Sequence, residues 1–339
     1  MVPLPRTLHT NYSGTLVGAR AMAPQLAEPL LAASPSSAST RSDVGPVLLM
    51  VCSELLLASV NAIVKSVSSW PAERIMLVRF GVDLVLCLCV CAWRRLELPA
   101  LADIVTLCLR GLAYCLGVLF FWSAIRSCLP IGDVVVLLLS ASPLFLVLLA
   151  RMVLAERIPK EWPLQMAFLV LGAVLVNKPG SLDESCPLST ALLPMGAAVC
   201  WSLMNLASRR VPHVPSVQVM LFNDMAAIVF ACATSLILRA WGGGMTAALD
   251  ALTPPLDRST LLVMGSAVLG WLGLMGNVKG YQTVSVAAVA TIAGSTSIPF
   301  NYCFQVLLFH EPLDLYSAAG ATIVTATTIV MTVLRHLAA

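Results

Sequence analysis

Apolar residues along this chain gather in ten long runs that are separated by short polar segments. Each run has roughly 18–25 residues, the length that a helix needs to cross a hydrocarbon layer about 30 Å thick. The pattern therefore predicts ten transmembrane helices. We place them at 46–66, 74–93, 104–125, 130–153, 161–178, 189–208, 216–239, 259–279, 285–309 and 315–335.

The composition agrees with this pattern. Of the 339 residues, 59% are hydrophobic and only 11% are charged, whereas ordinary soluble domains have about 25% charged residues. The alternative is a soluble protein with a large helical core, but ten near-continuous runs leave little room for it. We expect an all-α membrane protein.

The first 44 residues differ from the rest. This segment contains several prolines and the serine-rich stretch "SPSSAST" at 34–40, and it has no long apolar run. Such a composition predicts a disordered tail, and a secretory signal peptide is disfavoured because it needs an apolar core. Three arginines leave an organelle transit peptide open as a weaker alternative.

The distribution of basic residues predicts the orientation. With the N-terminus in the cytosol, 12 of the 20 Lys and Arg residues fall on the cytosolic side and 6 on the far side, while Arg79 and Arg110 lie within runs. Cytosolic loops carry the excess of basic residues in membrane proteins. We therefore expect an integral, multi-pass protein with both termini in the cytosol; the sequence does not indicate which membrane holds it.

Two stretches resemble each other across the chain. "LLLSASPLFLVLLARMVLAERIP" at 137–159 and "AGSTSIPFNYCFQVLLFHEP" at 293–312 each have a proline in mid-run and a glutamate-proline corner. The shift of 156 that relates Pro143 to Pro299 also carries Gly117 onto Gly273, and "VC" at 51–52 recurs at 199–200. We predict two five-helix repeats, 45–180 and 187–338, which are inverted because five is odd.

Inverted repeats with interrupted helices at matching positions indicate a transporter with a midplane site. A proline leaves one backbone carbonyl without its donor, and nearby hydroxyls can bond to that carbonyl or to a solute. A kink that serves packing alone is the alternative. The residues concerned are Ser140, Ser142, Pro143, Ser295, Ser297 and Pro299.

The segments 124–159 and 280–314 resemble the two copies of the EamA domain in the drug/metabolite transporter superfamily, and the likeness extends over about 45–338. The chain is loosely similar to subgroup G of solute-carrier family thirty-five. The resemblance implies a transporter of small metabolites. Two departures stand out: Ala155 and His310 replace the usual corner glycine, and the paired Lys-Arg of phosphate-translocating members is missing, which counts against a sugar-phosphate.

Ionisable residues inside a membrane helix are costly and usually functional. Glu54 lies roughly 13 Å into the first run at 1.5 Å per residue, with Asn61 and Lys65 on the same helical face. We expect Glu54 to bind or couple the solute; a hydrogen bond within the bundle is the alternative. The other candidates for the binding site are Arg79 and Asp83, an i, i+4 pair that could equally be structural, together with Asn223 and Asn301.

Other chemistry has little support. Nine of the eleven cysteines lie in apolar runs without metal-ligand spacing, and we expect packing residues rather than metal ligands or disulfides. We expect no cofactor, no metal, no catalytic residues and no nucleic-acid partner; lipid and a small solute are the expected partners, and a homodimer is compatible with the sequence. The prediction is a transporter that works by alternating access. A membrane-embedded regulator or scaffold without transport is the alternative, and an enzyme ranks last.

Overall fold

The structure is a computed structural model, and it describes residues 44–154, 162–177, 188–208, 210–242, 257–283 and 286–338. Within these ranges the chain forms ten helices and no strand. Residues 1–43, with the predicted tail, and the corner residues Ala155 and Glu156 lie outside the described residues. The helices are α1 (Val44–Ser66), α2 (Ala72–Arg94), α3 (Leu101–Ile125), α4 (Ile131–Leu154), α5 (Trp162–Asn177), α6 (Leu188–Ser208), α7 (Ser216–Gly242), α9 (Arg258–Thr283), α10 (Val286–Phe309) and α11 (Leu315–Ala338).

Each helix coincides with one predicted apolar run, and the all-α prediction is confirmed for the described ranges. Six helices are long and apolar enough to cross a membrane: α1, α2, α3, α4, α7 and α9. The apolar parts of α5, α6 and α11 are shorter, at Trp162–Asn177, Leu192–Ser208 and Leu315–Met331. The chain is thus an integral, multi-pass membrane protein, and the crossing of all ten helices stays a prediction.

The surface of the bundle is largely apolar, and its mainly apolar interior also holds several polar and charged residues. Leu109, Val229 and Leu315 expose 63%, 68% and 81% of their surface, which would be unfavourable for side chains of this kind in water. Among the buried residues, by contrast, are Glu54 and Asp83, at 6% and 3% exposure. This distribution suits a hydrocarbon solvent, where the polar groups gather inside the helix bundle.

Polar residues at the helix ends satisfy free backbone groups. Asp257 caps α9, because its Oδ1 accepts the Thr260 amide at 2.8 Å, and Asp314 caps α11 through the Ser317 amide at 3.0 Å. The bonds from the Thr260 amide and hydroxyl hold the pKa of the Asp257 carboxyl below its usual value. Directly after the C-terminal end of α10, His310 has a φ of 54°. This is a left-handed conformation that favours glycine. The glycine that the resemblance implies at this corner would adopt this conformation without strain.

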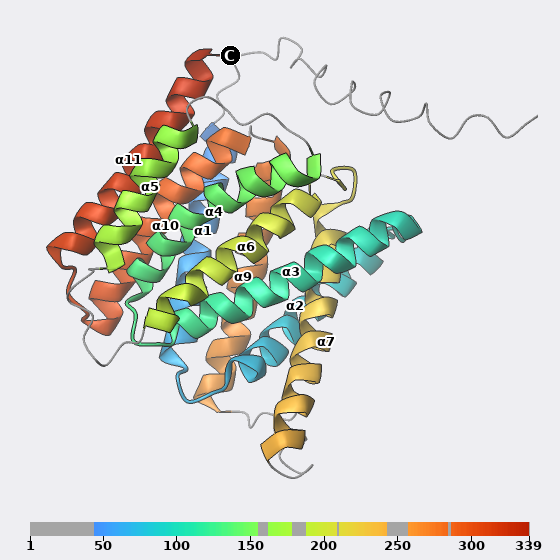
Figure 1. Ribbon diagram of the computed structural model, residues 1–339. Coiled ribbons are helices and arrows are strands. Elements are labelled where there is room, and N and C mark those ends of the chain that lie inside the picture. Colours follow the sequence, from blue (N-terminus) through green and yellow to red (C-terminus); the bar gives the residue numbers. More distant parts are fainter. Residues whose placement is uncertain are drawn as a thin grey trace, which may run out of the picture. The chain divides into compact units, whose positions relative to one another are not determined.

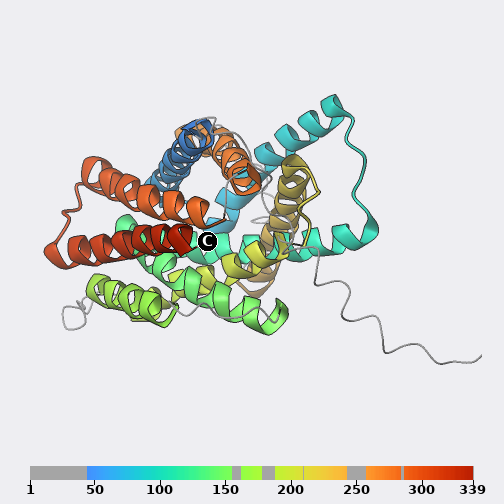
Figure 2. The ribbon, with the colours of Figure 1, turned by 90° about the horizontal axis from the view of Figure 1, so that it is seen from above.

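Helices that are far apart in the sequence pack side by side. α1 lies against α9 and α10, while α3 lies against α6 and α7. α2 contacts α7 and α9, and α4 contacts α5 and α6. α5 packs along α11, as Figures 1 and 2 show, and α10 also contacts α11. Every helix of residues 44–177 thus has its most extensive contact with a helix of residues 188–338.

One cysteine departs from the sequence-based expectation. Nine of the described cysteines are free, as expected for packing residues. Cys128, in the turn between α3 and α4, is disulfide-bonded, so the prediction that disulfides are absent is wrong at this position. Its position after the end of α3 explains the error, because we argued from cysteines inside the apolar runs, where packing is the usual role.

Candidate functional site

Glu54 of α1 lies in a polar cluster with two residues of the second half. Its Oε1 accepts a hydrogen bond of 2.9 Å from Asn277 Nδ2 on α9, and the Ser297 hydroxyl of α10 also bonds to the carboxylate. The Asn277 Oδ1 is buried and has no hydrogen-bond partner among the described residues. We call Glu54, Asn277 and Ser297 the Glu54 cluster; it combines a carboxylate with an acceptor that is free to receive a donor.

Glycines of α9 create this cluster. A Cβ on Gly273 would lie 3.1 Å from the Ser53 carbonyl oxygen, and a Cβ on Gly276 would lie 2.2 Å from the Ser53 hydroxyl. The two helices can therefore approach closely only because these positions lack side chains. These glycines therefore serve helix packing. The close approach places Asn277, one residue after Gly276, within hydrogen-bonding distance of Glu54.

The other polar residues on the same face of α1 also meet the second half. Asn61 Nδ2 donates to Asn301 Oδ1 at 3.1 Å, and Asn301 Nδ2 donates to the Ser297 carbonyl at 2.8 Å. Farther along α1, Lys65 Nζ forms an ion pair of 2.6 Å with Glu311, beyond the end of α10. The face predicted from the +7 and +11 spacing is therefore a continuous line of polar contacts.

The start of α4 adds contacts to α10 that the sequence analysis missed. Tyr302 donates its hydroxyl to Asp133 at 2.8 Å, and the Gly132 amide donates to Gln305 Oε1 at 3.0 Å. A Cβ on Gly132 would lie 2.2 Å from the Tyr302 ring. The sequence did contain a signal for these contacts, because Asp133 is a carboxylate that lies three residues after Pro130 inside an apolar run.

Arg79, Asp83 and Asn223 lie in a second polar region, formed by α2, α3 and α7. Arg79 Nε is 4.0 Å from Asp83 Oδ2, which agrees with the predicted i, i+4 pair. Asn223 Oδ1 accepts a bond of 2.6 Å from Arg110, and the Arg110 Nε donates to Ser208 at 2.7 Å. Arg110 is buried at 4% exposure, so it points into the bundle instead of snorkelling to the membrane surface.

The proline segments contribute less directly. In α4, the Ser140 and Ser142 hydroxyls donate to the carbonyls of Leu137 and Leu138 in their own helix. Ser202 of α6 donates to the Ser142 carbonyl at 3.1 Å, just before the partly buried Pro143. In α10, Pro299 is exposed and lines a groove of about 440 Å³ with residues of α11. The Ser295 side chain lies outside the described residues.

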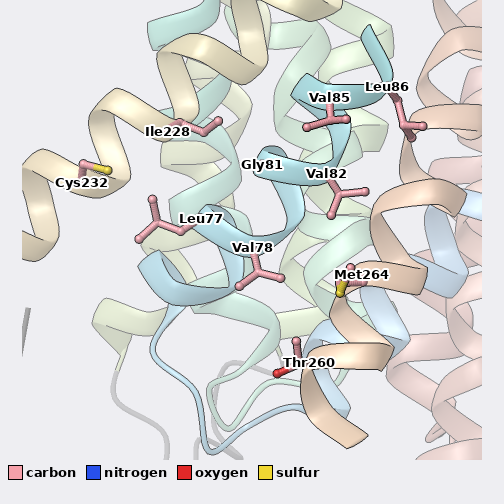
Figure 3. A pocket seen from close by; sticks show the side chains of 10 residues that line it. All are labelled: Leu77, Val78, Gly81, Val82, Val85, Leu86, Ile228, Cys232, Thr260 and Met264. Atoms are coloured by element: carbon pink, nitrogen blue, oxygen red, sulfur yellow. The ribbon is translucent and has the colours of Figure 1, made fainter. Parts of the chain in front are cut away.

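A groove of about 660 Å³ lies on another side of α2, between α7 and α9. Figure 3 shows its lining, in which Leu77, Val78 and Val82 of α2 are accompanied by Met264 and by the Thr260 hydroxyl of α9. None of the predicted site residues lines this groove. Its nearly uniform apolar surface suits hydrocarbon chains better than a polar solute.

The described residues include no group of three His, Cys, Asp or Glu side chains that could hold a metal ion. The functional groups of the two polar regions are instead carboxylates, carboxamides, hydroxyls and two arginines. Such groups can bind a polar solute or a proton by hydrogen bonds and charge.

Comparison with known proteins supports this interpretation. Residues 34–178 match the EamA-like transporter family. The pseudopaline exporter CntI of Pseudomonas aeruginosa is 25% identical over 291 residues, covering 84% of this chain and 95% of the exporter, in both strain UCBPP-PA14 and strain PAO1. A crystal structure, described only as that of a protein, superposes with a TM-score of 0.59 at 16% identity, over 86% of this chain and 99% of its own, and shows the fold alone.

The predicted resemblance is thus confirmed for the first proline-centred stretch, by a match that begins before the first helix and ends just after α5. Together with the apolar helices and the buried polar residues, this match supports a membrane transporter. Residues 34–178 of this chain are similar to the EamA-like transporter family.

Proposed function

We propose that the protein transports a small polar or charged metabolite across a membrane by alternating access, and that the Glu54 cluster binds the solute. The observation that carries this proposal is a buried carboxylate beside an unpartnered carboxamide oxygen, Asn277 Oδ1. Two acceptors at one place favour a solute with N–H or O–H donors. The similarity to an exporter supports outward transport.

We further propose that the ten helices form two inverted repeats. Exchanging the first to fifth helices with the sixth to tenth turns the pair α1–α9 into α6–α3 and the pair α1–α10 into α6–α4, and all four pairs are in contact. Gly117 packs against Cys200 and Trp201, and Gly273 packs against Ser53. These are equivalent contacts under the shifts that the sequence suggests. Such a symmetric arrangement favours rocking of one bundle against the other.

The repeats differ at the proposed site, which gives the bundle one polar cluster there instead of two. The shift of 148 between the "VC" pairs carries Glu54 onto Ser202, and the shift of 156 relates Asn277 to Phe121 and Ser297 to Ala141. The rings of Trp201 and Phe121 are in contact at a tilt of 53°, with centroids 5.1 Å apart. Glu54, Asn277 and Ser297 therefore have apolar or weakly polar counterparts in the other repeat. The solute has a single carboxylate to bind. Ser140, Ser142, Pro143, Ser295 and Pro299 are proposed to shape the path beside it.

Solute flux is the direct test of this function. Purified protein in sealed vesicles is expected to move at least one member of a panel of labelled polar metabolites faster than protein-free vesicles do. Thermal stabilisation of the protein by a panel compound would select the solutes to test, because a ligand that binds the folded state stabilises it. Stabilisation without flux for every such compound would favour a regulator or scaffold, and chemical conversion of the compound would favour an enzyme.

The disulfide of Cys128 supports the proposed orientation. The turn between α3 and α4 falls on the far side if both termini are cytosolic, and disulfides persist in oxidising, non-cytosolic compartments. In sealed vesicles with the cytosolic side outward, we expect a thiol reagent that cannot cross membranes to label Cys128 only after both a permeant reductant and detergent are added. Mass spectrometry of the labelled peptide provides the measurement.

The control for this experiment is Glu97→Cys, in the exposed turn between α2 and α3 on the proposed cytosolic side. This cysteine is expected to react in sealed vesicles without detergent. Labelling of Cys128 in sealed vesicles after reduction, with protection of the cysteine at position 97, would reverse the orientation.

A further inference from the structure

Two carboxylates lie in the second polar region, where α2 packs on α7. Asp83 of α2 and Asp224 of α7 are 3% and 1% exposed. They face each other closely, because Cys87, one turn after Asp83 on α2, has its Sγ 3.4 Å from Asp224 Oδ2. Asp224 lies eight residues after the start of α7, or about 12 Å along the helix at 1.5 Å per residue. The pair is therefore deep in the bundle.

Hydrogen bonds fix the role of Asp224 as an acceptor. The Trp271 indole N–H of α9 donates to Cys87 Sγ at 3.3 Å, and the Cys87 thiol donates to Asp224 Oδ2 at 3.4 Å. Because the sulfur accepts the hydrogen bond from the indole, the thiol is free to donate its own hydrogen bond to the carboxylate. A thiol is a weak donor and compensates little of a full negative charge.

The two arginines of this region equal the two carboxylates in number, but within the described residues neither arginine is seen to form a hydrogen bond with a carboxylate. Arg79 is the nearest to Asp83, but its Nε is 4.0 Å from Oδ2, beyond hydrogen-bonding distance. Both Arg79 Nε and Asp83 Oδ1 are buried without a hydrogen-bond partner in the described part of the chain. Arg110 is engaged by Asn223 and Ser208. With both carboxylates ionised, neither negative charge would have a hydrogen-bonded cation in a low-dielectric interior, which is costly.

In the part of the chain that the structure describes, the neighbouring helices supply no further charged partner for the carboxylates. α9 contributes Trp271 and Gly270, and a Cβ on Gly270 would meet the Arg79 guanidinium. α3 contributes Tyr114 and Cys115, which are neutral in their protonated forms. The titratable and charged groups that face the pair are thus Arg79 and Cys87 on α2, and Arg110, Tyr114 and Cys115 on α3.

We infer that Asp83 and Asp224 together hold one exchangeable proton and form a coupling site separate from the Glu54 cluster. The inference deepens the proposed function, on which it rests. A proton suits the pair better than a sodium ion, because metal cations bind several oxygen ligands. α2 and α7 are continuous helices without proline, so their backbone carbonyls stay within the helical hydrogen bonds.

The geometry suggests how the proton leaves. When α2 moves relative to α7 and α9, Arg79 can close the 4.0 Å gap to Asp83 and form a charged hydrogen bond. The carboxylic acid then gives its proton to water on the open side, and the carboxylate that remains pairs with the guanidinium. Proton release is thereby linked to the movement of the helices, without any other reactant.

Infrared difference spectroscopy of the purified full-length protein tests the site without a solute. The wild type is expected to show a protonated carboxyl band at neutral pH that disappears in Asp83→Asn/Asp224→Asn. Asp103→Asn, which changes a carboxylate paired with His213 near the start of α3, is the matched control and should keep the band. An unchanged band in the double variant would overturn the inference, whatever the outcome of flux measurements.

Two further measurements keep the test decisive. Cys87→Ala leaves both carboxylates in place and removes one hydrogen bond, so it should shift the band frequency even if the double variant does not fold. In vesicles, a pH gradient should drive solute accumulation of about tenfold per pH unit for one proton exchanged per solute, and Asp83→Asn should abolish this accumulation. Flux that is equally independent of pH in the wild type and in Asp83→Asn would overturn the coupling role.

Discussion

Glu54→Gln is expected to lower the rate of solute transport by about 10- to 100-fold while the protein stays folded. Glutamine keeps the shape of the side chain but removes its charge, and a hydrogen bond to a charged group contributes about 1.5–3 kcal/mol. The amide group would also place donors where the Asn277 amide and the Ser297 hydroxyl now donate to a carboxylate. Both the solute and the cluster therefore lose an acceptor.

Initial rates in vesicles, normalised to the amount of folded protein, measure this effect. Glu73→Gln is the matched control, because it removes a carboxylate in the first turn of α2, outside both polar regions. It should transport at the wild-type rate. Transport by Glu54→Gln that is indistinguishable from this control would place the solute site elsewhere, and would reduce Glu54 to a hydrogen-bonded residue of the bundle.

The helices of this protein are predictable because hydrocarbon imposes a length. The run at 216–239 corresponds to α7, Ser216–Gly242, and the run at 104–125 corresponds to α3, Leu101–Ile125. The ends differ by a few residues because the terminal turns extend into the interface, where polar residues can continue a helix. The apolar pattern marks only the part that contacts hydrocarbon.

The partners of the polar residues are not predictable in the same way. Periodicity correctly places Glu54, Asn61 and Lys65 on one face, because a single helix determines that relation. Their partners Asn277, Asn301 and Glu311 are more than 220 residues away in the sequence. Which helices meet depends on small residues such as Gly273, whose neighbours only the fold reveals.

The prolines illustrate a second limit. A proline marks the place where a helix lacks one backbone donor, and this can be recognised in the sequence. Which neighbours surround the proline, however, depends on how the helices pack. Pro143 is partly buried beside a contact to α6, whereas Pro299 is exposed beside α11. Equivalent sequence positions therefore have different surroundings.

Gly320→Ala is expected to lower the free energy of unfolding by about 1–3 kcal/mol, the usual effect of overpacking. A Cβ at this position of α11 would lie 2.6 Å from the Gly172 carbonyl oxygen of α5 and 2.6 Å from Val176 Cγ2. A backbone oxygen cannot move aside as a side chain does, so the two helices must separate. The reciprocal contact, a Cβ on Gly172, would lie 2.6 Å from Val324 Cγ2.

Gly81→Ala is the matched control for this prediction, because it makes the same chemical change where no atom lies within 4 Å of the new Cβ. Thermal unfolding in detergent, followed by the loss of helical signal, should show a lower midpoint for Gly320→Ala than for Gly81→Ala. α5 and α11 carry no residue of the Glu54 cluster and neither Asp83 nor Asp224. The transport rate per folded molecule should therefore stay unchanged in Gly320→Ala, and a selective loss of rate would instead show that the contact between α5 and α11 takes part in the transport movement.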